Sequence, residues 1–339
     1  MSIAAIVEIP DSPAATWTHY QAGSTLRAMC YSAMVYAEHK KFLRETGSGM
    51  DVDSYVRIFW LGEGRDPFKE KRPRVPRALE RDILKNGPEE LASFIRQWDA
   101  AETTLLEKEV FTQRKRVADA ERALQSKVTK KAQEDVRIGG NKMKNAMRRL
   151  ADLKATESKD RDFRIYPGSY CPVIVLENGK RVTKLMRYQC RPAGKPSKND
   201  ALYPGTYNAR RDNLDGYWKG LFGVTHGLMV CTRFYENVEG EDGANKVLEF
   251  EPKTGEPMLI ACLWSHWTDP KGKEPDLLSF AAITDDPEPE VAAAGHDRTI
   301  INIKPEHVEA WLDPQGDIAA MQAIFDDKRH PYYEHRKAA

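Results

Sequence analysis

The spacing of hydrophobic residues along this 339-residue chain changes near Asp160. From Pro88 to Leu153, apolar side chains recur at steps of three and four residues among Lys, Arg, Glu and Gln, which is the pattern of an amphipathic helix. Beyond Asp160, short apolar runs alternate with turn-forming residues, which is typical of strands. The pattern therefore predicts a long helical arm followed by a β-rich part.

The helical arm has a clear start signal at Pro88, because proline suits the first helical position and the acidic residues that follow favour the first turn. We expect Gly139 and Gly140 to interrupt it, with a second helical stretch reaching Leu153. Residues 101–160 hold fifteen Lys and Arg against ten Asp and Glu, so the arm is mildly basic. This charge fits either a solvated face or an arm that follows DNA or binds a partner.

The β-rich part predicts an antiparallel, barrel-like core with flanking helices, an α+β fold. Asn178-Gly179 between two apolar runs predicts a hairpin turn. Before the arm, we expect a helix from near Ala33 to Gly47. The further predicted strands are 221–230, 247–250, 258–264, 278–283 and 299–303, and the further predicted helices are 305–312 and 318–325.

Composition narrows the function classes. The chain is 41% hydrophobic and 30% charged, and no apolar run is long enough for a membrane span. Its net charge of +1 does not by itself indicate a nucleic-acid partner. The five cysteines are odd in number and widely spaced, which fits neither a disulfide framework nor a zinc site and favours a cytoplasmic location. No histidine spacing indicates a metal site, and we expect no cofactor.

Four local motifs carry candidate chemistry, and each has a plain structural alternative. Cys30 follows Met29; if it became the N-terminal residue, its amine and thiol together would form a nucleophile that condenses with an aldehyde. An internal Cys30 is more simply a buried structural cysteine. Asn208 and Arg210 alternate after a turn, so they point to one side and could hold a phosphate, or they belong to a surface turn.

The other two motifs offer proton transfer. Glu236 follows two aromatic residues at the expected end of an apolar strand, where loss of water would let it exchange a proton near neutrality. The alternative is an edge glutamate facing water. His296 stands in Gly-His-Asp-Arg, before a predicted strand, and suits a general acid or base. The alternative is a loop histidine.

These motifs, in this order, resemble the SOS-response-associated peptidase (SRAP) family of abasic-site-processing proteins. The resemblance covers Met29 to about Trp60 and Phe163 to Pro331. It implies a SRAP-like core interrupted by an insertion. The expected division is a leader at 1–28 that is not part of the mature core, a first core part at 29–70, a helical insertion at 71–160 and a second core part at 161–339.

The resemblance also implies residue roles. Cys30 matches the cysteine that links to the aldehyde of an abasic site in single-stranded DNA. Glu236 and His296 match residues of proton transfer and ring opening. The expected DNA-binding residues are Asn208, Arg210, Asp212 and Arg298. Asp212 stands where the family usually has Glu, Asn237 stands in place of an aromatic residue, and Tyr188-Gln189-Cys190-Arg191-Pro192 replaces a Trp-Gly-Leu-x-Pro stretch.

The expected function is an abasic-site sensor that forms a thiazolidine crosslink through Cys30, with a lyase or self-reversal activity. Its expected partner is single-stranded DNA containing abasic sites. Two alternatives stay open at this point. One is a cysteine-dependent peptidase that processes itself or other chains, and the other is a non-catalytic module that binds single-stranded DNA.

Overall fold

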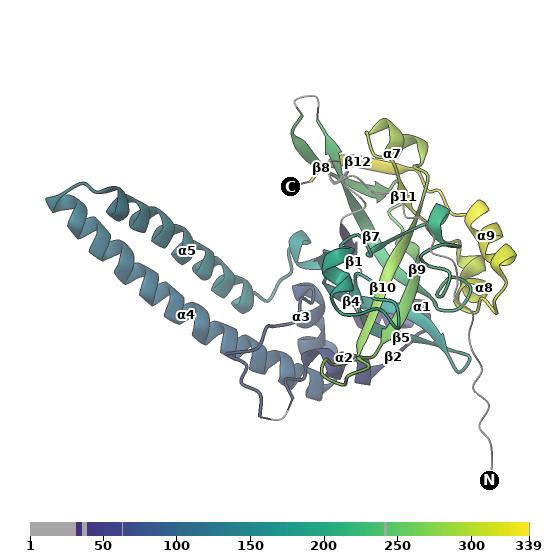
Figure 1. Ribbon diagram of the computed structural model, residues 1–339, viewed down its shortest axis with the longest axis horizontal. Coiled ribbons are helices and arrows are strands. Elements are labelled where there is room, and N and C mark those ends of the chain that lie inside the picture. The colour runs from purple at the N-terminus through teal and green to yellow at the C-terminus, as the bar shows by residue number, and fades with distance from the viewer. Residues whose placement is uncertain (1–31, 36–38, 63, 241–242, 339) are drawn as a thin grey trace, which may run out of the picture.

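The computed structural model describes residues 32–35, 39–62, 64–240 and 243–338. A body built around one sheet carries a helical hairpin that projects from one side (Figure 1). The predicted α+β class with flanking helices and a long helical arm is confirmed. Within the described ranges, no helix is long and apolar enough to cross a membrane.

In the described part of the chain, twelve strands form the sheet, and most of their pairings are antiparallel. They are β1 Ser32–Val35, β2 Gly49–Met50, β3 Arg164–Ile165, β4 Tyr170–Glu177, β5 Lys180–Tyr188, β6 Asn208–Arg210, β7 His226–Glu239, β8 Asn245–Pro252, β9 Met258–Trp267, β10 Leu277–Asp285, β11 Thr299–Ile300 and β12 Tyr333–Lys337.

The helices belong to two groups, those of the arm and its base and those that cover the sheet (Figure 1). They are α1 His39–Thr46, α2 Val52–Phe59, α3 Arg77–Asn86, α4 Glu89–Ser126, α5 Lys130–Lys154, α6 Asn199–Leu202, α7 Pro289–Ala293, α8 Val308–Leu312 and α9 Ile318–Asp326, with short 3-10 helices at Asp160–Phe163, Arg211–Asn213 and Pro305–His307.

The strand pairings run in a circuit, from β4 through β5, β10, β9 and β7 back to β4. Two links of this circuit are short. Strand β7 joins β4 only at Leu228 and Ile174, and β10 joins β5 only at Ser279 and Phe280. The core is therefore barrel-like, as predicted, without being a clean barrel.

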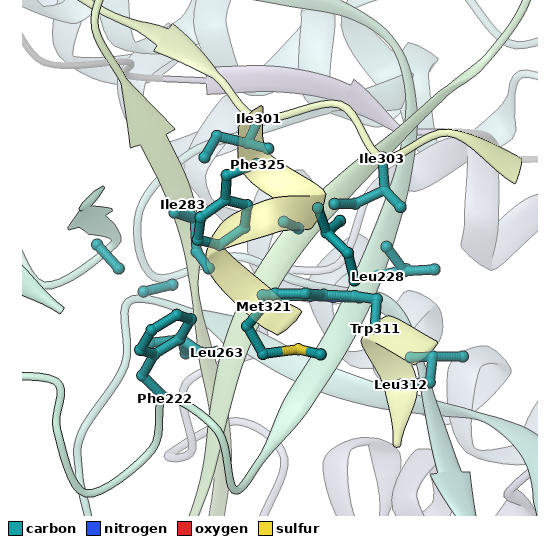
Figure 2. Close-up of a cluster of buried hydrophobic side chains, with 14 of the residues drawn as sticks. Phe222, Leu228, Leu263, Ile283, Ile301, Ile303, Trp311, Leu312, Met321 and Phe325 are labelled. Atoms are coloured by element: carbon teal, nitrogen blue, oxygen red, sulfur yellow. The ribbon is translucent and has the colours of Figure 1, made fainter. Parts of the chain in front are cut away.

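The two faces of the sheet bury different hydrophobic clusters. One face carries Val173, Met229, Ile260 and Phe280, which belong to a cluster inside the circuit. The other face packs against α8 and α9 (Figure 2). Since strand side chains alternate between faces, each residue's position in its strand decides which cluster it joins. The residues of the outer cluster that Figure 2 labels are Phe222, Leu228, Leu263, Ile283, Ile301, Ile303, Trp311, Leu312, Met321 and Phe325.

Several local predictions are confirmed. The hairpin of β4 and β5 turns at Asn178 and Gly179, whose φ angles of 51° and 71° are those of the tight turn that Asn-Gly favours. Helix α9 matches the predicted 318–325 almost residue for residue. The predicted strand at 221–230 is wrong at its start, because residues before His226 form turns that pack under the outer cluster.

Two other predictions are wrong in an instructive way. Ala33 does not begin a helix; it lies in β1, which pairs with β3 on one side and β7 on the other and is buried on both faces. Gly139 and Gly140 do not interrupt a helix either, because α5 runs through both and the break falls at residues 127–129. A Cβ on Gly139 would lie 2.8 Å from Cγ2 of Val117, so this glycine lets α4 and α5 pack closely.

The base of the arm is built into the body. Leu79 and Ile83 of α3 and Leu91 and Ile95 of α4 pack in one buried cluster with Leu185 of β5. The distal hairpin contacts mainly itself, α4 against α5. The division into 71–160 and its flanks stays a prediction, since the helices of that range share a core with residues on both sides of it.

Candidate functional site

Glu236 and His296 meet inside the protein. His296 Nε2 lies 3.1 Å from Glu236 Oε2, and the two side chains are 3% and 0% exposed. The second imidazole nitrogen, Nδ1, lies 3.0 Å from the carbonyl oxygen of Arg298 and accepts a bond of 3.3 Å from its amide. A buried carboxylate beside an imidazole can hold or transfer a proton without bulk water.

Each member of this pair is positioned by its neighbours in the sheet. The prediction that Glu236 lies at the end of a strand is wrong, because β7 continues to Glu239. Leu248 of β8 pairs with Glu236. Burial of Glu236 on the face of Phe234 follows from the alternation of side chains along β7. His296 follows Gly295, whose φ of 92° turns the chain from α7 toward β11.

The strand beside Glu236 is β1. Its first residue, Ser32, pairs with Tyr235. Arg164 joins the two, since its Nε donates to Ser32 Oγ at 2.9 Å and its guanidinium lies 3.7 Å from the centre of the Tyr235 ring. Burial and the nearby Glu249 carboxylate raise the pKa of the Tyr235 phenol, so it stays protonated. Cys30 lies outside the described residues.

Asn208 and Arg210 lie on β6, which pairs in parallel with β10. Asn208 is buried, and its Oδ1 accepts a bond of 2.6 Å from Thr284 Oγ1. Its Nδ2 is buried without a hydrogen-bond partner among the residues that the structure describes. This amide is therefore a buried donor that a ligand could use.

Arg210 and Asp212 form an exposed, two-contact ion pair with distances of 2.9 and 2.5 Å. With Arg298 and Thr284 they line a cavity of about 400 Å³. Arg298 links this cavity to the buried pair, because its backbone contacts His296 while its side chain lines the cavity. The structure thus brings together six predicted residues in two adjoining groups that meet at Arg298.

Sequence reasoning missed two residues at this site. Thr284 ends the apolar run of β10, and Arg164 is the first residue of the short strand β3. A threonine after a buried strand and an arginine two residues from Tyr166 are weak signals, and only their contacts with Asn208 and Tyr235 single them out.

The other histidine and cysteine side chains of the core look structural. His226 Nε2 accepts from the Gly223 amide, Nδ1 faces the Trp311 carbonyl, and burial lowers the pKa of His226 to about 3. Among the described residues, the cysteines are Cys171, Cys190, Cys231 and Cys262, all free and buried. Burial raises the pKa of each thiol, to about 12 for Cys190. Within the same residues no group of His, Cys, Asp and Glu could hold a metal ion.

The family described as SOS response associated peptidase (SRAP) matches residues 123–337. The chain belongs to the SRAP family. Membership associates this SRAP protein with the SOS response and DNA damage. The matched range contains Asn208, Arg210, Glu236 and His296, while Cys30 precedes it.

Solved structures give weaker likenesses. A protein from Bacteroides thetaiotaomicron is 16% identical, with a TM-score of 0.45 over 52% of this chain and 78% of that one. A protein from Bordetella bronchiseptica is 18% identical, with a TM-score of 0.42 over 52% and 87%. A phage-related protein of the same organism is 20% identical, with a TM-score of 0.40 over 55% and 85%. No curated protein matches this chain.

Proposed function

We propose that this SRAP protein binds single-stranded DNA and forms a covalent thiazolidine with abasic sites through Cys30. The observation that carries the proposal is the buried pair of Glu236 and His296, 3.1 Å apart, beside the strand that leads back to Cys30. Ser32 pairs with Tyr235, the neighbour of Glu236. Two residues of chain span at most about 7 Å, and the proposal is that Cys30 acts within that reach of Ser32.

The reaction balances with the groups of the protein and the DNA alone. The α-amine of Cys30 adds to the C1′ aldehyde of the ring-opened sugar, and the adduct loses water to give a Schiff base. The Cys30 thiol then adds to the imine carbon, the nitrogen takes a proton, and a thiazolidine forms. The overall change is aminothiol plus aldehyde to thiazolidine plus one water. Proton transfers to and from nitrogen and oxygen are the steps that Glu236 and His296 serve.

The neighbouring polar residues fit the DNA partner. Asn208 Nδ2, the buried donor without a described partner, suits an oxygen of the abasic sugar. Arg210 and Arg298 line the adjoining cavity, where a guanidinium can bind a phosphate through two hydrogen bonds. Asp212 is proposed to position Arg210 until a phosphate takes its place. These roles complete a site for one sugar and its flanking phosphate.

The burial of the four described cysteines favours Cys30 as the nucleophile. The four described cysteines are buried, and burial raises the pKa of each, which removes the reactive thiolate. A cysteine peptidase would also need Cys30, so the peptidase alternative rests on the same residue. It differs in needing the thiol alone, whereas the thiazolidine needs a free amine as well.

Borohydride trapping separates the three candidate functions. The chain beginning at Cys30 is incubated with a single-stranded oligonucleotide that holds one abasic site, and sodium borohydride is added within seconds. A Schiff base is then reduced to a stable amine that survives denaturing electrophoresis. We expect a trapped product with abasic DNA and none with intact DNA of the same sequence.

Two controls complete this experiment. Replacing Cys30 with Ser keeps an amine but removes the thiol, so trapping should persist while the unreduced thiazolidine is lost. A peptidase or a simple binding module would give no trapped product with either chain. That result, with the protein folded and bound to the oligonucleotide, would overturn the proposal.

A further inference from the structure

A groove of about 570 Å³ runs along the base of the helical arm. One wall is the turn-rich segment around Lys71 and Arg74, and the opposite wall is formed by α4, α5 and the segment that leads into β3. Its lining is rich in cations, with seven Lys and Arg against four Asp and Glu. The groove lies outside the catalytic pair and outside the cavity of Arg210.

The seven cations of this groove fall into two classes, four that pair with carboxylates (Arg72, Arg77, Arg149 and Arg161) and three that do not. Arg72 and Arg77 are largely buried and bonded to Glu80 and Asp99, so their charges hold the base of the arm to the body. Lys71, Arg74 and Arg164 have no carboxylate partner among the described residues. Among the residues that the structure describes, no carboxylate competes with an outside anion for these three charges.

Arg74 is held in place by its backbone. Its carbonyl oxygen accepts a bond of 2.8 Å from the amide of Tyr170, the first residue of β4, while its side chain is exposed. A cation on a fixed backbone loses less freedom on binding than one on a free loop. Arg74 is thus suited to a repeated contact with a phosphate.

One end of the groove reaches Tyr235, the residue before Glu236 in β7, through Arg164. Arg164 lines the groove, bonds Ser32 and covers the ring of Tyr235, which adjoins Glu236. Beside it, the Tyr166 ring is 38% exposed and lies 5.0 Å from the same guanidinium. A cationic path with an aromatic surface along it is how proteins bind a single strand without reading its sequence.

We propose that this groove binds the phosphate backbone of the DNA strand on one side of the abasic site, with Lys71 and Arg74 as its outer contacts. The inference rests on the proposed function for the identity of the strand. It adds a binding surface that depends on the arm, because the groove's far wall is made by α4 and α5. A strand whose target sugar lies at Glu236 passes Arg164 before it reaches Arg74.

The test compares two double variants with the same loss of charge. Lys71→Ala/Arg74→Ala removes the outer contacts, and Lys130→Ala/Lys131→Ala removes two exposed lysines at the far end of the hairpin. Fluorescence anisotropy measures binding of single-stranded oligonucleotides extended stepwise on the 5′ or the 3′ side of an uncleavable abasic analogue. The salt dependence of each affinity is measured as well.

We expect extension on one side only to strengthen binding by the unmodified protein. The groove variant should lose that gain, and its salt slope should fall by about 1.4, since each single-strand phosphate contact contributes about 0.7. The hairpin-tip control should keep both the gain in affinity and the salt slope of the unmodified protein. Equal behaviour of the groove variant and the unmodified protein, or equal losses in both double variants, would overturn the inference.

Borohydride trapping distinguishes a failure of the groove inference from a failure of the proposed function. The hairpin-tip variant should give the same trapped yield as the unmodified protein at every DNA concentration, whereas the groove variant should need more DNA to reach that yield. Absence of trapping in every chain, with the one-sided length dependence intact, would refute the crosslink and leave the groove standing. An acidic peptide should compete with the oligonucleotide equally well in the unmodified protein and in the groove variant. That result would confirm that the groove selects nucleic acid.

Discussion

The imidazole of His296 lies 3.1 Å from the carboxylate of Glu236, in a part of the sheet where neither side chain reaches solvent. The two residues come from strands and turns far apart in the sequence, β7 and the segment before β11. In the proposed function, this contact is the site of proton transfer, and it lies beside β1, the strand that begins two residues after Cys30. The account of this SRAP protein depends on that contact.

Glu236→Gln should slow the covalent step and leave DNA binding nearly unchanged. The amide keeps the shape of the side chain but cannot take up a proton, and a general acid or base typically contributes 10²- to 10⁴-fold in rate. Single-turnover crosslinking and anisotropy measure the two quantities separately. Glu249→Gln is the matched control, because Glu249 is also a buried carboxylate of this sheet and has no contact with His296. Comparable rates in both variants would argue against a proton-transfer role.

Arg210→Ala and Asp212→Asn should act in opposite directions on DNA affinity. Loss of Arg210 removes a phosphate contact, which should cost roughly tenfold in affinity and about 0.7 in the salt slope. Asp212→Asn frees the guanidinium from an exposed ion pair that contributes less than about 1 kcal/mol, and it removes a negative charge near the phosphate. A modest gain of about two- to fivefold is expected. Weaker binding by Asp212→Asn would contradict the proposed exchange, in which a phosphate takes the place of Asp212 on Arg210.

Gln189 adopts a φ of 122°, a backbone conformation that residues other than glycine rarely adopt. Its side chain donates to the Asp200 carbonyl at 3.1 Å, which helps to hold it there. Gln189→Gly and Gln189→Ala both lose that bond, but only glycine relieves the strain. The glycine variant should therefore unfold with a free energy about 1–2 kcal/mol higher than the alanine variant.

The control for this comparison is Lys180, an exposed strand position without a positive φ. There the order should reverse, with glycine less stable than alanine by about 0.5–1 kcal/mol. Urea unfolding of the four variants gives both differences. Alanine equal to or better than glycine at position 189 would contradict the strain.

His226 should make the protein less stable as the pH falls below about 6.5. Burial lowers the pKa of His226 to about 3 in the folded state, against about 6.5 unfolded, so between these values the unfolded chain binds one more proton. The contribution is fully present above pH 6.5 and is lost progressively toward pH 3, with a slope that reaches about 1.4 kcal/mol per pH unit.

His226→Gln isolates this effect, because the other titrating groups are common to both proteins. Between pH 6.5 and 5, the free energy of unfolding of the unmodified protein should fall more steeply than that of the variant. Carboxylates titrate mostly at lower pH and affect both proteins alike. Parallel pH profiles for the two proteins would show that His226 takes up its proton in the folded state.

The sequence predicts best what is decided locally. The Asn178-Gly179 turn follows from two residues that readily adopt positive φ, and α9 follows from its own apolar pattern. Gly139 shows the opposite case, since glycine indicates a break when only the local chain is considered. Its helical role comes from the close approach of Val117, a contact made by tertiary packing.

The candidate site also has a part that the sequence predicts and a part that it does not. Glu236 and His296 could be named from their motifs, but their contact could not, because it depends on the register of β7 and on the turn at Gly295. Arg164 was missed altogether, since its position over Tyr235 arises from the pairing of β3, β1 and β7. Long-range strand pairing is the information that a single sequence does not supply.

The measurement that tests the central claim most directly is the intact mass of the DNA adduct formed without any reducing agent. Two chains are compared, one whose first residue is Cys30 and one that keeps the residues before it. The account predicts an adduct only for the first chain, with a mass equal to protein plus abasic oligonucleotide minus one water, because an amide nitrogen cannot form the Schiff base. A stable adduct of the same type on a protein whose mass still includes residues 1–29 would contradict it.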